Sequence, residues 1–99
     1  MNPGEIRGQL NRILSSHTFR SAEREKALLR YVVELTIDGR GGELKEYKIG
    51  VEAFDRGHGF DPRRDTIVRT EARNVRRRLA RYYEEEGHSD PIRIELPKG

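Results

Sequence analysis

The sequence predicts one small domain that is mainly α-helical, with a small β element near its C-terminal end. Apolar residues recur every three or four positions through most of the chain, whereas one short segment near the end alternates strictly. Only 33% of the 99 residues are hydrophobic and 37% are charged, so a few well-placed apolar stripes must build the core. This length is enough for one domain of ordinary small size.

Two amphipathic helices are expected in the first part of the chain. Ile6, Leu10 and Ile13 recur at helical spacing, which predicts a helix over residues 5–16. Ser21 offers an N-cap for the next helix, which an apolar stripe carries to Asp38 before a glycine ends it. We therefore divide the chain into an N-terminal helix with its connection, residues 1–20, and a main unit, residues 21–99.

The middle of the chain predicts a short extended piece, a third helix and a long loop. Residues 43–45 favour the extended piece, and Leu44, Tyr47, Val51 and Phe54 give the third helix its buried stripe. Residues 56–64 contain two glycines and an Asp-Pro pair, so a helix cannot continue there.

The last third predicts a long helix and a strand. Asp65 is placed to cap the helix, which runs to about Glu86. Its apolar stripe consists of Val68, Ala72, Val75, Leu79, Tyr82 and Tyr83. Residues 92–96 alternate between apolar and charged, the pattern of a half-buried strand, and residues 97–99 predict the turn of a hairpin. Because a lone strand is marginal, we expect residues 92–96 to pair with residues 43–45.

Positive charge is concentrated in the last helix and the residues just before it. Between residues 62 and 82 the chain carries eight arginines against Asp65 and Glu71, a balance of +6, while the whole chain is +3 and the remainder is therefore −3. A basic element on a mildly acidic body is typical of a protein that binds a polyanion.

The arginines of this helix are poorly explained as a solvated surface alone. Arg69, Arg73, Arg77 and Arg81 follow one another at intervals of four residues, and like charges at that spacing destabilise an isolated helix by roughly 0.2–0.5 kcal/mol per pair. A phosphate backbone would supply the missing negative charge. Arginine also forms bidentate contacts with guanine or phosphate, which lysine does not. The alternatives are an acidic protein partner and RNA.

Other functional classes find little support in the residues. The chain has no cysteine, and His17, His58 and His88 lie far apart, so we expect no metal site and no cofactor. No arrangement of side chains is typical of catalysis, so we do not expect an enzyme. The sequence shows neither a secretory signal nor an apolar run long enough for a membrane span, which favours a cytoplasmic location.

From about residue 21 onward, the order of elements resembles the winged helix-turn-helix DNA-binding domain of the response-regulator (OmpR/PhoB-like) type. The matching stretches are residues 28–35, 44–54, 68–79 and 92–99. Similar segments stand at the N-terminus of some longer bacterial proteins, so further domains of a longer chain are expected partners. The N-terminal helix, the long loop over residues 56–64 and the missing second wing strand depart from the family pattern.

The resemblance implies sequence-specific binding of duplex DNA, in transcriptional regulation, with the long helix in the major groove. The residues expected to contact bases or the groove are Arg69, Thr70, Arg73, Asn74 and Arg77. Those expected to hold phosphates are Arg63, Arg64, Arg76, Arg81 and Lys98. The DNA target, the controlling signal and the oligomeric state are not indicated by the sequence.

Overall fold

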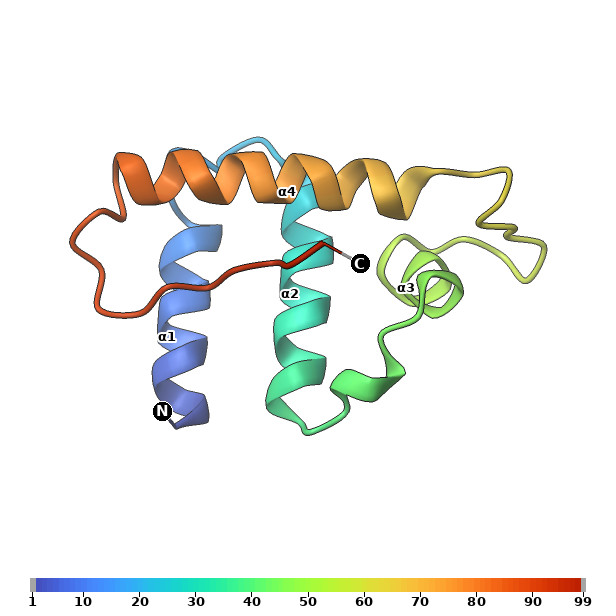
Figure 1. The fold of residues 1–99 in the computed structure, drawn as a ribbon, viewed down its shortest axis with the longest axis horizontal. Coiled ribbons are helices and arrows are strands. Elements are labelled where there is room, and N and C mark those ends of the chain that lie inside the picture. The colour runs from blue at the N-terminus through green and yellow to red at the C-terminus, as the bar shows by residue number, and fades with distance from the viewer. Residues whose placement is uncertain (1, 99) are drawn as a thin grey trace.

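The computed structural model describes residues 2–98, and this part of the chain forms four α-helices and one short 3-10 helix. In chain order these are α1 (Pro3–Leu14), α2 (Glu23–Ile37), η1 (Gly41–Glu43), α3 (Glu46–Ala53) and α4 (Ile67–Glu84). Helices α1 and α2 lie side by side and antiparallel, α4 crosses the end of both, and α3 lies on the far side of α2 (Figure 1).

The core forms where α1, α2 and α4 meet. The largest apolar side chains with almost no exposure come from α1, its connection to α2, α2 itself and α4: Leu10, Ile13, Phe19, Leu28, Leu29 and Val75. Removing such side chains from water is the main favourable term in folding. The three helices are therefore held by one shared core, as the apolar stripes of the sequence predicted.

The helix ends differ in detail from the prediction. Helix α1 begins at Pro3 because the Asn2 side chain accepts a hydrogen bond from the Glu5 amide at 2.9 Å, and it ends at Leu14 rather than residue 16. Helix α2 begins at Glu23 after Ala22, so the predicted Ser21 cap is not used. The N-cap of α4 is Thr66, although the predicted cap, Asp65, accepts a hydrogen bond from the Ile67 amide at 3.1 Å, and the helix ends at Glu84 rather than near Glu86.

A close contact fastens the loop between α3 and α4. Gly50 of α3 leaves room for the ring of Phe60, and a Cβ at this glycine would lie 2.3 Å from the Phe60 Cε2 atom. Phe60 is buried there. The loop is therefore anchored at its middle, which fixes the residues that lead into α4.

The predicted fold class is wrong. Within residues 2–98 there is no strand and no sheet, so a mainly α fold with a small β element, the winged helix-turn-helix, is not what the chain forms. The 43–45 piece belongs to the turn around η1 and does not pair with residues 92–96. The predicted 97–99 turn includes Gly99, which lies outside the described residues.

Side chains replace the missing strand partner of residues 92–96. The Tyr83 hydroxyl donates to the Ile92 carbonyl at 3.0 Å and accepts from the Ile94 amide at 2.8 Å, and Arg76 donates to the Leu96 carbonyl at 3.0 Å. The predicted alternation of burial is present, with the apolar residues half-buried and Arg93 and Glu95 exposed. This segment runs back along α4 across α1 and α2 (Figure 1).

Two carboxylates hold the turn after α4 to the N-terminal part of the chain. Glu86 accepts hydrogen bonds from the His17 and Thr18 amides at 3.0 and 2.7 Å. Asp90 accepts from the Gln9 side chain at 2.8 Å and from the Tyr82 hydroxyl at 2.5 Å. Of the helices described, none combines the length and the apolar character that crossing a bilayer requires.

Candidate nucleic-acid interface

Helix α4 has one buried face and one charged, exposed face. Val68, Val75, Leu79, Tyr82 and Tyr83 are buried, as the apolar stripe predicted. The opposite face carries Arg69, Thr70, Arg73, Arg77 and Arg81, all exposed. Helix α4 lies along one edge of the molecule, across the ends of α1 and α2 (Figure 1), and the exposure of these side chains leaves the face available to a partner.

Arg73 and Arg77 are distinguished from the other arginines of residues 62–82. Both are exposed, and within residues 2–98 neither guanidinium has an ion pair or a hydrogen bond. They lie one turn apart, a separation of about 6 Å along the helix axis. Their positive charge is thus left for an external anion.

The flanking residues of this face are held by neighbours within the molecule. Arg69 pairs with Glu46 of α3 at 3.0 Å and donates to the Pro62 carbonyl at 2.6 Å. Asn74 donates to the Glu71 carboxylate at 3.1 Å and is half-buried. Arg81 lies 3.6 Å from the carboxylate of Glu85. Their outward reach is more restricted than that of Arg73 and Arg77.

Two arginines of the preceding loop extend the basic surface beyond the start of α4. The side chains of Arg63 and Arg64 are each 90% exposed and share the carboxylate of Asp61, at 3.2 and 3.8 Å. Exposed pairs of this kind contribute only about 0–1 kcal/mol. A phosphate can therefore compete for both guanidinium groups.

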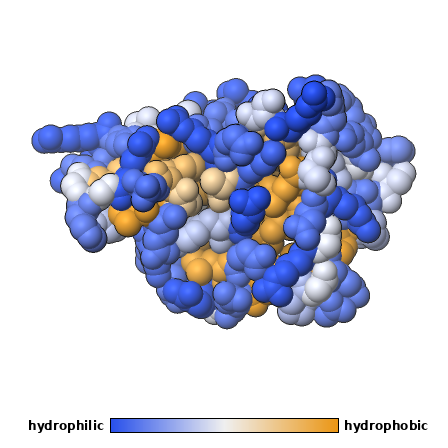
Figure 2. Space-filling view, turned by 180° about the vertical axis from the view of Figure 1, so that it is seen from behind, coloured by the Kyte–Doolittle hydropathy of each residue, from blue (hydrophilic) through white to orange (hydrophobic). Residues whose placement is uncertain are grey.

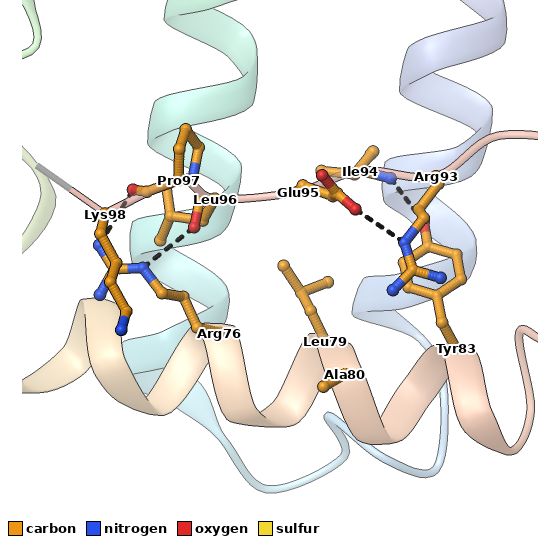
Figure 3. A pocket seen from close by; sticks show the side chains of 10 residues that line it. All are labelled: Arg76, Leu79, Ala80, Tyr83, Arg93, Ile94, Glu95, Leu96, Pro97 and Lys98. Atoms are coloured by element: carbon orange, nitrogen blue, oxygen red, sulfur yellow. Dashed lines mark hydrogen bonds and ion pairs between the residues drawn. The ribbon is translucent and has the colours of Figure 1, made fainter.

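Arg76 and Lys98 lie beside a groove between α4 and residues 93–98. The groove has a volume of about 320 Å³ and an apolar floor that includes Leu79 and Tyr83 (Figure 3). Arg76 donates to the carbonyls of Leu96 and Pro97, each at 3.0 Å, so it fastens this segment. Lys98 is exposed at the far end, next to Arg76.

Sequence reasoning counted Arg78 in the basic charge but could not assign its role. Arg78 points into the molecule, where it pairs with Glu25 of α2 and donates to the Thr18 carbonyl at 2.7 Å. Glu25 is only 8% exposed. Because Glu25 lies 53 residues away in sequence, no local pattern could have found this pair.

Arg93 is a basic residue that the list of candidates missed. Its guanidinium lies 4.8 Å from the centre of the Tyr83 ring and pairs with Glu95 at 2.9 Å. The alternation of residues 92–96 was the available signal, since it places Arg93 on the exposed side. Arg93 adds positive charge to the rim of the groove.

A second hollow in the molecule is a poor surface for a polyanion. Viewed from behind, apolar surface appears among hydrophilic residues (Figure 2). A shallow hollow of about 400 Å³ lies between α2 and α3, and its charged lining residues are Arg30, Glu34, Asp38 and Glu52. Three carboxylates against one arginine give this lining a negative balance that disfavours phosphate, so the basic edge along α4 is the better nucleic-acid candidate.

The described residues bring together no group of three His, Cys, Asp or Glu side chains that could hold a metal ion. The candidate interface is built from arginines, a threonine and a lysine on α4, the loop before it and the segment beside it.

Comparisons with protein-family models, curated proteins and solved structures find no match to this chain.

Proposed function

We propose that this protein binds duplex DNA through the exposed face of α4. The observation that carries the proposal is the pair Arg73 and Arg77, which are exposed, one turn apart and without a partner in the described chain. Six other arginines of residues 62–82 have intramolecular contacts. Two unpaired cations near the centre of a helix bind most strongly to a partner with a high density of negative charge, such as a phosphate backbone.

The shape of this face also fits a DNA groove. An exposed helix fits the major groove, which is about 12 Å wide. Arg69 and Arg77 are eight residues apart, about 12 Å along the axis, which corresponds to three or four base pairs at about 3.4 Å each. In this proposal Arg73 and Arg77 read base edges, with Thr70 between them and the start of the helix.

The flanking cations hold the backbone in the same proposal. Arg63 and Arg64 precede the helix, Arg81 follows the central pair, and Lys98 lies at the side. Their contacts with phosphates would set the position of the helix but carry no sequence information. Asn74 and Arg76 are engaged within the molecule and contribute less.

The proposed biological role is transcriptional regulation in the cytoplasm, where a small sequence-specific DNA-binding domain has its target. We include no enzymatic activity in this role. An acidic protein partner or RNA would use the same positive charge, and both are outcomes of the test below.

The first test is the salt dependence of binding to random duplex DNA. With four to six phosphate contacts, the logarithm of the affinity should fall against the logarithm of salt concentration with a slope of about −4 to −5. Single-stranded RNA should compete less well than duplex DNA. Absence of binding at low salt, or better competition by RNA, would reject the proposal.

The second part of the test separates base contacts from phosphate contacts. A preferred site is selected from random DNA, and the variants Arg73→Ala, Arg77→Ala, Arg64→Ala and Arg81→Ala are titrated against that site and a scrambled one. The first two should lose about 1–3 kcal/mol on the preferred site, and the last two should weaken both sites alike and lower the salt slope by about one. Equal loss by all four variants would leave only backbone binding.

A further inference from the structure

Glu46 of α3 lies against the basic face of α4. It stands in the first turn of α3, and its carboxylate accepts a hydrogen bond from the Arg69 Nε atom at 3.0 Å. The Arg69 Nη2 atom donates to the Pro62 carbonyl at 2.6 Å. One side chain of α4 is thus held from two other places in the chain, α3 and the loop before α4.

The two contacts use only part of the donor capacity of the Arg69 guanidinium. A guanidinium has five N–H groups in a fixed plane. The Nε–H donates to Glu46 and one Nη2–H donates to Pro62, so three N–H groups, two on Nη1 and one on Nη2, have no partner in residues 2–98. The Arg69 side chain is 55% exposed, so a ligand in solution can reach it.

A held arginine differs from a free one in what binding costs. Ordering a long side chain on binding costs about 0.5–1.5 kcal/mol, and a side chain that is already held avoids most of that cost. A planar fork fixed in one direction also accepts only acceptor pairs that lie in its plane, such as O6 and N7 of guanine or two phosphate oxygens. Arg73 and Arg77, by contrast, have no such support in the described residues.

We propose that Glu46 is a positioning residue that, together with the Pro62 carbonyl, orients Arg69 for a bidentate contact with a pair of acceptors on duplex DNA. This inference rests on the proposed DNA binding by α4. By its charge alone, an acidic residue such as Glu46 would oppose DNA binding. In this proposal Glu46 instead favours binding, because it orients Arg69. The ligand chemistry is shared by the guanine edge and the phosphate group, and the two are separated by the test.

The discriminating variant is Glu46→Gln, which removes one negative charge beside the DNA face. If charge were the only effect, affinity would rise for every sequence. If Glu46 orients Arg69, affinity for the preferred site should instead fall, by up to about tenfold, because a neutral amide oxygen holds the guanidinium less firmly than a carboxylate does. A fall confined to the preferred site identifies a guanine contact, and a fall on preferred and scrambled sites alike identifies a phosphate contact.

Glu85→Gln is the matched control. Glu85 also pairs with an exposed arginine, Arg81 at 3.6 Å, but both residues belong to the end of one helix, where the pair connects no separate elements. Its removal should raise affinity modestly and equally for both sites. The comparison therefore subtracts the purely electrostatic gain from the Glu46→Gln result.

A double-variant cycle completes the experiment. Arg69→Ala should lose at least as much affinity as Glu46→Gln, because it removes the contact itself, and the combined variant should lose no more than Arg69→Ala alone, because Glu46 acts through Arg69. Circular dichroism melts confirm that each variant is folded. If Glu46→Gln raises the affinity as much as Glu85→Gln does, the role of Glu46 is overturned while DNA binding stands. If the unaltered protein does not bind DNA, the proposed function itself is rejected.

Discussion

At the scale of single residues, arginines that look alike in sequence have different surroundings. Arg77 and Arg78 are neighbours in the chain, yet the first is exposed and unpaired within the described residues, and the second reaches Glu25 and the Thr18 carbonyl inside the molecule. The difference follows from the helical repeat, because a step of about 100° moves the side chain from the outer face toward the core. Net charge alone therefore overestimates the cations available for binding.

The first prediction contrasts Arg78 with Arg73. Arg78→Ala should lower the free energy of unfolding by about 2 kcal/mol, because it leaves the buried Glu25 carboxylate without its charged donor. Arg73→Ala should change it by less than about 0.5 kcal/mol, since an exposed side chain without partners is removed. Urea denaturation monitored by circular dichroism measures both. Equal losses would mean that α4 is rotated relative to the core.

At the scale of elements, the helices were predictable and the C-terminal segment was not. The stripe from Val68 to Tyr83 has the helical period and is buried as expected, because one period allows only one face to enter the core. The alternation of residues 92–96 correctly predicted which side chains are half-buried. The strand predicted from the same alternation is wrong, because a strand also needs a backbone partner, and here Tyr83 and Arg76 supply the hydrogen bonds.

The candidate interface was predictable in its location but not in its internal contacts. The face that carries Arg73 and Arg77 follows from the helical period alone. The contacts of Arg69 with Glu46, and of Arg76 with residues 96 and 97, join elements that are 20 or more residues apart. Such contacts depend on how helices and segments pack, which single-sequence patterns do not specify.

The second prediction concerns the anchor of the loop between α3 and α4. Gly50→Ala would place a methyl group within 2.3–2.8 Å of three atoms of the buried Phe60 ring, so the ring must move. Overpacking and loss of the Phe60 site should outweigh the gain of about 1 kcal/mol in helix propensity, for a net loss of about 1–3 kcal/mol. Urea denaturation of the variant gives this value.

Gly57→Ala is the control for that loop. A Cβ at Gly57 meets nothing within 4 Å, so this variant should be within about 0.5 kcal/mol of the unaltered protein. Unchanged stability of Gly50→Ala would show that the loop is not anchored by Phe60, and the position of Arg63 and Arg64 would then need another explanation.

At the scale of the whole molecule, basic and acidic groups are concentrated in different parts of the chain. The +6 balance of residues 62–82 lies on and before α4, whereas the −3 of the remainder includes carboxylates that hold the chain together. Glu86 binds the connection between α1 and α2, and Asp90 joins Gln9 of α1 to Tyr82 of α4. The end of α4 after the basic face is thus fixed to α1 by groups that must stay ionised.

Because of these contacts, the free energy of unfolding depends on pH in the acid range. The hydrogen bond from the Thr18 side chain, with those from the His17 and Thr18 amides, holds the pKa of Glu86 below its ordinary value of 4.5. The hydrogen bond from the Tyr82 hydroxyl, with that from Gln9, does the same for the pKa of Asp90, whose ordinary value is 3.8. A carboxyl whose pKa is lower in the folded state contributes stability above its unfolded pKa and loses it as pH falls through the folded pKa.

The third prediction follows from that sign. The free energy of unfolding should be nearly constant from pH 7 to about pH 5.5 as far as these two groups are concerned, and should fall once the pH drops below about 4.5. Glu86→Gln should be less stable at pH 7, because an amide replaces one acceptor with a donor opposite the His17 and Thr18 amides, and its stability should fall less between pH 5 and pH 3. Urea denaturation at pH 7, 5, 4 and 3 measures both effects.

Glu84→Gln is the control for this prediction. Glu84 is an exposed neighbour whose side chain has no hydrogen bond in residues 2–98, so this variant should keep the full loss of stability in acid. If Glu86→Gln and Glu84→Gln lose stability in parallel as the pH falls, the Glu86 contacts do not stabilise the ionised carboxylate, and the attachment of α4 to α1 must depend on Asp90 and the apolar core.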